Sequence, residues 1–221
     1  AYDYGADAVY AGSPRYSLRA RNNEFAKLDV LEQGIKEAHE RNKKFFLTVN
    51  TLPHNSKLKT FVSDMEPLIA MKPDALIMAD PGLIMTVREK WPEMPIHLSV
   101  QANTTNYWGV KFWQNIGVER IILSRELSME EIAEIRQECP DIELEVFIHG
   151  ALCIAYSGRC LLSGYFNHRD PNQGTCTNSC RWDYKVHNAV ESDAGDAQLL
   201  QGFNFEKAQE EANQNFEGIN G

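Results

Sequence analysis

No apolar run in this chain of 221 residues approaches the roughly 18 residues that a membrane-spanning helix requires. We therefore expect no membrane partner. No charged stretch leads into an apolar one at the start of the chain, as it would in a secretory leader. Together with the acidic composition, this predicts a cytoplasmic protein, in a compartment where thiols stay reduced and disulfides are rare.

Basic residues are scarce as well: 22 Lys and Arg side chains stand against 31 Asp and Glu, and the net charge is −9. The acidic excess is concentrated in residues 186–221, which contain seven acidic residues and one base. Residues 1–185 are therefore only mildly acidic. This argues against a broad basic surface for non-specific nucleic-acid binding, but not against a nucleic-acid substrate.

The chain also lacks a Gly-x-Gly-x-x-Gly sequence after its first apolar run, which argues against a Rossmann fold. Instead, short apolar runs alternate strictly with amphipathic stretches. The predicted strands are Asp7–Ala11, Lys44–Asn50, Asp74–Ala79, Pro95–Ser99, Glu119–Ser124 and Glu143–Ile148. The predicted helices are Leu28–Arg41, Ser56–Met71, Pro81–Lys90, Tyr107–Ile116 and Ser128–Glu138, the last with a capping box. This alternation predicts an α/β fold of the TIM-like (β/α)-barrel type with a parallel sheet.

We expect the barrel to be incomplete. The first residues, AYDYGADAVYAG, resemble the end of a helix entering a strand, so we expect a fragment of a larger domain. Residues 1–150 would form the partial barrel, and residues 151–185 a cysteine-rich segment packed on the barrel mouth. Residues 186–221 would form an acidic linker or disordered tail, with one weak helix at 205–213.

Active residues of a parallel barrel lie at the C-terminal ends of its strands and in the loops that follow. These positions give the candidate substrate-binding residues Arg15, Arg19, Arg21, Asn50, His54, Gln101, Asn103, Arg125 and Glu126, and the candidate catalytic residues Glu145 and His149. The arginines suit a carboxylate or phosphate. Each position also has a structural alternative: a solvated charge, a surface ion pair, a loop hydrogen bond or, for Glu145, pairing with an arginine.

Four of the five cysteines lie close together in the sequence, with the spacing Cys-x6-Cys-x15-Cys-x3-Cys. They are Cys153, Cys160, Cys176 and Cys180, and only Cys139 lies elsewhere. Clustered thiols in a reduced compartment favour a metal site over disulfides. The spacing matches neither a zinc ribbon nor the common ferredoxins, and favours iron–sulfur over zinc only slightly. The alternative is a set of buried thiols plus one incidental pair.

One sequence pattern is specific to a known family. It is E-x-F-x-x-G-x-x-C-x4-G-x-C-x-x-S, formed by Glu145, Phe147, Gly150, Cys153, Gly158, Cys160 and Ser163. This pattern resembles the signature of the collagenase-like peptidases of unassigned catalytic type. The phrases YGADAVYAG, DALIMADPGLIM, PIHLSVQAN, HGALCIAYSGRCLLSGY and RDPNQGTCTN resemble the tRNA hydroxylation branch of that family. The resemblance covers about residues 1–185, as an N-terminal portion of such a protein.

The resemblance implies a TIM-like barrel and O2-independent hydroxylation of the tRNA wobble uridine to 5-hydroxyuridine, with prephenate as a small anionic co-substrate. It implies a [4Fe–4S] cluster whose ligands include Cys153, Cys160 and Cys176. The fourth ligand is either Cys180 or a cysteine further downstream. Tyr156 and Arg159, between the first two cysteines, join the substrate-binding set.

The family name suggests a second function, a cysteine- or metal-dependent peptidase. The sequence contains neither a His-Glu-x-x-His zinc motif nor a Gly-x-Ser-x-Gly elbow. A nucleophile pair such as Cys153 with His149 would instead be needed. Because a cluster would use the same thiols as ligands, the two functions compete for the same atoms. A third hypothesis is a non-catalytic binding protein whose partner does the chemistry.

Overall fold

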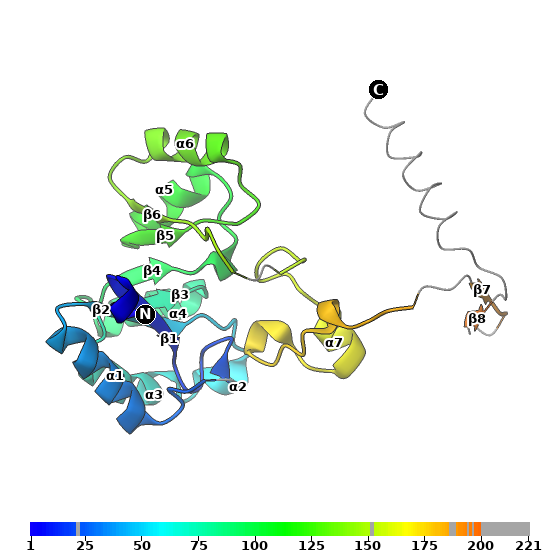
Figure 1. The fold of residues 1–221 in the computed structure, drawn as a ribbon, viewed down its shortest axis with the longest axis horizontal. Coiled ribbons are helices and arrows are strands. Elements are labelled where there is room, and N and C mark those ends of the chain that lie inside the picture. The colour runs from blue at the N-terminus through cyan, green and yellow to red at the C-terminus, as the bar shows by residue number, and fades with distance from the viewer. Residues whose placement is uncertain (21–22, 151–152, 186–188, 194, 196, 200–221) are drawn as a thin grey trace. The chain divides into compact units, whose positions relative to one another are not determined.

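The computed structural model describes residues 1–20, 23–150, 153–185, 189–193, 195 and 197–199 (Figure 1). The chain divides into two compact units, Ala1–Cys180 and Arg181–Gly221. The first unit carries the parallel sheet and the four clustered cysteines. Among the described residues, no helix is both long enough and apolar enough to cross a membrane.

Six parallel strands form one sheet, and they follow one another in chain order (Figure 1). They are β1 (Ala8–Gly12), β2 (Lys44–Val49), β3 (Ala75–Met78), β4 (Ile96–Leu98), β5 (Arg120–Ile122) and β6 (Glu143–Glu145). A doubly wound sheet would reverse its strand order, whereas here each strand pairs only with its neighbours in sequence. The described part of the sheet does not close on itself. The predicted fold, an incomplete (β/α) barrel, is therefore confirmed.

Helices follow the strands and provide the outer layer. They are α1 (Leu28–Glu40), α2 (Asn55–Leu58), α3 (Phe61–Ala70), α4 (Pro81–Lys90), α5 (Tyr107–Asn115) and α6 (Met129–Glu138), with single 3-10 turns η1 (Tyr2–Tyr4) and η3 (Val100–Ala102). The apolar stripe of α1 buries Leu31, Ile35 and Ala38 at helical spacing. The predicted capping box of α6 is present, with Ser128 and Glu131 each accepting the other's backbone N–H.

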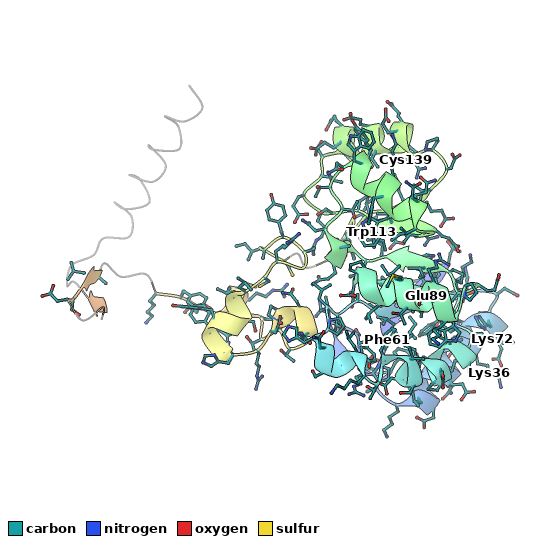
Figure 2. All side chains as sticks on the ribbon, turned by 180° about the vertical axis from the view of Figure 1, so that it is seen from behind. Lys36, Phe61, Lys72, Glu89, Trp113 and Cys139 are labelled. Carbon is teal, nitrogen blue, oxygen red and sulfur yellow. The ribbon has the colours of Figure 1, made fainter. Side chains whose placement is uncertain are left out.

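The main core lies between the sheet and the helices. Alternate strand residues such as Leu47, Leu76 and Leu98 point into it and are fully buried. Phe61 and Cys139, labelled in Figure 2, belong to the same core. The other face of the sheet carries a much smaller apolar cluster, formed by Phe46, Ala75, Ile77 and Ile122.

Polar residues continue this second face toward β6. Arg120 donates hydrogen bonds to Glu143 (2.8 Å) and Glu145 (3.2 Å), and its guanidinium lies 5.3 Å from the centre of the Phe46 ring. His97 is only 6% exposed and meets the Phe46 ring edge-on, at 4.6 Å between ring centres. Burial, with the nearby Arg120 charge, lowers the pKa of His97 to about 4. His97 is therefore neutral at neutral pH.

Two predicted elements are wrong in part. The helix predicted over Ser56–Met71 is two helices, because Thr60 leaves the helical conformation (φ −114°) and its hydroxyl donates to Asp64. The last predicted strand, Glu143–Ile148, ends at Glu145. There the Leu123 N–H donates to the Glu145 carbonyl, and Val146–Ile148 no longer follow the sheet.

The cysteine-rich segment contains α7 (Leu162–Asn167), η4 (Pro171–Gln173) and η5 (Ser179–Arg181). In the second unit, β7 (Ala189–Glu191) pairs antiparallel with β8 (Ala197–Leu199). The sequence indicated no periodic structure in that stretch. The helix predicted at 205–213 lies outside the described residues.

We expect His97 to make stability depend on pH. Its pKa is 6.5 in an unfolded chain and about 4 here, so between these values the unfolded chain binds a proton that the folded chain excludes. The free energy of unfolding should therefore fall as the pH drops from about 6.5 to about 4, by up to ~3 kcal/mol. Urea unfolding of the wild type and of His97→Gln across this range measures the effect. If both proteins lost stability in parallel, His97 would not be the cause.

Candidate functional site at the strand ends

Three loops meet at the C-terminal ends of β1, β2 and β4. Asn50 follows β2, and its side-chain oxygen accepts a hydrogen bond from the Leu18 N–H (3.2 Å) in the loop after β1. Its amide nitrogen donates to the Ser99 hydroxyl (3.2 Å) after β4. The strand ends are therefore brought together as the parallel topology requires. Asn50 is bonded to loop groups, which was the structural alternative for this residue.

The loop after β5 carries two predicted residues. Ser124 Oγ lies 2.8 Å from the side-chain oxygen of Asn103 and hydrogen-bonds to the Glu126 carboxylate. Arg125 donates a hydrogen bond to the Ser157 hydroxyl (2.9 Å), and its guanidinium lies 6.0 Å from the centre of the Phe147 ring. Arg125 therefore ties the β5 loop to the cysteine-rich segment. A guanidinium has five N–H donors, so further N–H groups remain for an anionic ligand.

A single asparagine, Asn172, joins the cysteine-rich segment to two strand ends. Gln101 donates from its side-chain amide to the side-chain oxygen of Asn172 (3.1 Å). Asn172 donates in turn to the Cys160 carbonyl (3.1 Å), and its own carbonyl accepts from the Leu52 N–H (3.1 Å). The backbone at Cys160 is thus fixed relative to the loops after β2 and β4.

Two glycines let the segment approach the strand ends closely. Gly158 (φ +74°) lies so near Gln101 that a Cβ would stand 2.5 Å from the Gln101 carbonyl oxygen. A Cβ on Gly174 (φ +86°) would stand 2.7 Å from the Ser17 carbonyl oxygen. Only glycine fits at such positions, because both the backbone conformation and the space exclude a side chain.

All four clustered cysteines carry free thiols; Cys153, Cys176 and Cys180 are exposed and Cys160 is half-buried. Thiols of this number suit an iron–sulfur centre. Within the described residues, however, no three His, Cys, Asp or Glu side chains are close enough together to hold a metal ion. Ligation would therefore require the thiols to converge.

The predicted arginine group is divided. Arg15 donates to Asp64 (2.8 Å), which also accepts from Tyr16 (2.6 Å) and Thr60 (2.8 Å). Burial opposes ionisation of Asp64, but these hydrogen bonds and the Arg15 charge hold its pKa below the usual value. Arg15 thus already has a carboxylate partner. Arg19 is exposed, and Arg21 lies outside the described residues.

The remaining predicted residues do not converge on one pocket. His54, His149, Tyr156 and Arg159 are exposed. Glu145 is paired with Arg120, the structural alternative considered for it, and its catalytic role stays a prediction. A hollow of about 410 Å³ lies nearer the opposite end of the strands, where Lys44, His97 and Arg120 line it.

Sequence reasoning missed residues that the structure brings to this region. Asn172 and Ser157 lie in turns of the cysteine-rich segment, where no periodic pattern marks them. Lys57 lies near Arg15 and Asp170, and burial, then the Arg15 charge, lowers its pKa. In the sequence, only its position shortly after the second strand could have identified Lys57 as a site residue.

The model of peptidase family U32 matches residues 1–216, and the chain belongs to this family. The chain is 67% identical over 195 residues to the tRNA hydroxylation protein P of Escherichia coli (strain K12), covering 88% of this chain and 43% of that protein. It is 36% identical over 183 residues to the 23S rRNA 5-hydroxycytidine C2501 synthase of the same strain, covering 83% of this chain and 27% of that protein. The chain therefore spans less than half the length of these curated relatives.

Among solved structures, the chain is similar to the U32 peptidase Mk0906, with a TM-score of 0.54 and 16% identity. The match covers 64% of this chain and 60% of that one. At this identity the likeness shows the fold alone.

Substituting alanine for Gly158 or Gly174 should loosen the cysteine-rich segment, because the new Cβ meets a backbone carbonyl. The rate of limited trypsin cleavage at Arg159 and Arg169 measures this loosening. We expect the rate to rise at least about tenfold, because roughly 1.4 kcal/mol of destabilisation shifts a local opening equilibrium by that factor. Gly150→Ala is the matched control, since Gly150 also has positive φ (+124°) but open space around it. Equal acceleration in all three variants would show that backbone strain, not docking, is responsible.

Proposed function

We propose that the protein containing this chain hydroxylates tRNA, converting the wobble uridine to 5-hydroxyuridine without O2 and with prephenate as co-substrate. The observation that carries this proposal is the 67% identity to a tRNA hydroxylation protein along 88% of the chain. The rRNA relative supports the same class of chemistry, because its name also records hydroxylation of a pyrimidine in RNA. Such a protein would work on tRNA in the cytoplasm.

The proposed cofactor is a [4Fe–4S] cluster held by Cys153, Cys160, Cys176 and either Cys180 or a cysteine further along the protein. Its support is the set of free thiols in one anchored segment. A cluster of this kind supplies one-electron transfer. Convergence of the thiols would accompany its assembly.

The proposed roles of the other residues follow from their positions. Arg125 and Arg159 would bind the carboxylates of the anionic co-substrate, because guanidinium groups pair with carboxylates in two-pronged geometry. Gln101 and Asn103 would position the substrate from the β4 loop. Glu145 and His149 would move protons, since both belong to the stretch from the end of β6 to the first cysteine.

A peptidase is the second candidate, favoured by the family's name and by the exposure of both Cys153 and His149. It would need one activated thiolate beside a base. A thiol bound to iron cannot act in this way, so the metal content of the protein separates the two candidates.

Protein purified without oxygen should contain about four irons and four acid-labile sulfides, with a broad absorption band near roughly 400 nm. Cys153→Ser, Cys160→Ser or Cys176→Ser should lose the band and most of the iron. Cys139→Ala is the control, because the Cys139 thiol is buried in the main core. In cells lacking the native gene, the same serine variants should fail to restore 5-hydroxyuridine, measured by mass spectrometry of tRNA nucleosides.

If wild-type protein contained no iron and still restored 5-hydroxyuridine, the proposed cluster would be refuted, whereas the proposed hydroxylase activity would stand. Gelatin cleavage that survives rigorous purification and disappears with Cys153→Ala would favour the peptidase instead.

Glu145→Gln separates a catalytic role from a structural one. Glutamine keeps the side-chain length and a hydrogen bond to Arg120, but it cannot move a proton. We expect the rate of uridine hydroxylation to fall about 100-fold, as for loss of a general acid or base. Glu143→Gln, which changes the other carboxylate partner of Arg120, should change the rate by less than about threefold. If both variants behaved alike, Glu145 would serve only the ion pair.

A further inference from the structure

The short helix α7 (Figure 1, yellow) buries a polar residue, Ser163. Ser163 and Asn167 lie one helical turn apart on the same face. Ser163 Oγ accepts from the Thr177 N–H (3.0 Å) and lies 2.9 Å from the Thr177 hydroxyl. Asn167 donates from its amide to the hydroxyls of Thr177 and Ser179, both at 3.0 Å. Hydrogen bonds, rather than apolar packing, hold this face of α7.

Between Ser163 and Asn167, α7 carries two aromatic residues with exposed surface. Tyr165 is 80% exposed and Phe166 is 45% exposed, and their rings pack edge-to-face at 5.2 Å. A helix at a protein surface normally buries its apolar side chains and exposes its polar ones. In α7 this order is reversed, which makes its exposed aromatic rings a candidate binding surface.

The sequence around these rings is basic, in a chain that is acidic overall. Residues 153–185 contain four Arg or Lys side chains and two Asp, whereas the whole chain carries a net charge of −9. Arg169 and Arg159 are exposed, and neither pairs with a carboxylate in the described part of the chain. The carboxylate of Asp170, next to Arg169, accepts the Asn172 N–H and caps η4.

We propose that the aromatic face of α7, Tyr165 and Phe166, is where unpaired bases of the RNA substrate stack, with Arg169 contacting a phosphate. Single-stranded RNA is recognised by aromatic stacking beside cationic groups. A lipid surface would instead be expected to meet an amphipathic helix much longer than α7. This inference rests on the proposed function, because that function makes an RNA loop the substrate.

The hydrogen bonds of α7 also connect this face to the cysteines. Thr177 directly follows Cys176, and Ser179 directly precedes Cys180. The bonds from Ser163 and Asn167 therefore fix the aromatic face relative to the backbone that carries two of the candidate ligands. A base stacked on α7 would be held at a constant position relative to the backbone of Cys176 and Cys180.

The test compares variants of the intact protein for binding of an unmodified tRNA transcript, measured by fluorescence anisotropy. Tyr165→Ala/Phe166→Ala should weaken binding at least about tenfold, since stacking of one or two bases is lost. Tyr165→Phe/Phe166→Tyr keeps both rings and should bind like the wild type. Trp108→Ala on α5 is the matched control, because Trp108 is 70% exposed and lies outside this segment. Arg169→Gln should weaken binding and reduce its salt dependence.

Two results would overturn the inference while leaving the proposed function intact: tRNA binding by Tyr165→Ala/Phe166→Ala equal to wild type, or an equal loss with Trp108→Ala. Footprinting with hydroxyl radicals supplies a readout that does not depend on variants. Tyr165 of the wild type should react with hydroxyl radicals in the free protein and be protected when tRNA is bound. Protection in the absence of RNA would show that another part of the protein covers Tyr165, which would contradict the inference. If wild-type protein failed to restore tRNA hydroxylation in cells lacking the gene, the proposed function would fail, and this inference with it.

Discussion

The close approach of the cysteine-rich segment to the strand ends is the constraint on which the site depends. Gly158 lies against the Gln101 carbonyl and Gly174 against the Ser17 carbonyl, at distances that no side chain permits. This contact removes polar groups of the segment and of the loops from water. Asn172 provides hydrogen-bond partners for two of them, the Gln101 amide and the Cys160 carbonyl. An unpaired buried amide costs about 1–3 kcal/mol, so this contact is specific as well as tight.

The half-barrel provides a stable support for this contact because its two faces differ. The face toward the helices is apolar and contains the main core. The opposite face has few apolar residues and ends in the Arg120 ion pairs and neutral His97. Stability therefore comes from the helix layer, while the strand ends carry loops whose side chains bond mainly to one another. Loops on a rigid scaffold can vary in chemistry without loss of the fold.

Much of the fold could be predicted because a parallel strand covered on both faces is a short continuous apolar run, as in FFLTV or RIIL. The positions of strand ends then follow from topology, so residues such as Asn50 and Gln101 were found. Long-range partners were not. Arg15 pairs with Asp64, and Gln101 pairs with Asn172, which lies 71 residues away. The break at Thr60 also depends on Asp64, so helical periodicity alone could not show it.

The two candidate functions make different demands on the backbone around the cysteines. A peptidase needs one thiol fixed beside one base, and the other cysteines are then free to move. Here the carbonyl of Cys160 is bonded to Asn172, and neighbours of Cys176 and Cys180 are bonded to α7. Three cysteines thus have restrained backbone and accessible or half-buried thiols. Restraint at several thiols at once reduces the entropy lost when they converge on a shared ion, and it brings no benefit to a single nucleophile. This arrangement favours ligands over a catalytic thiolate.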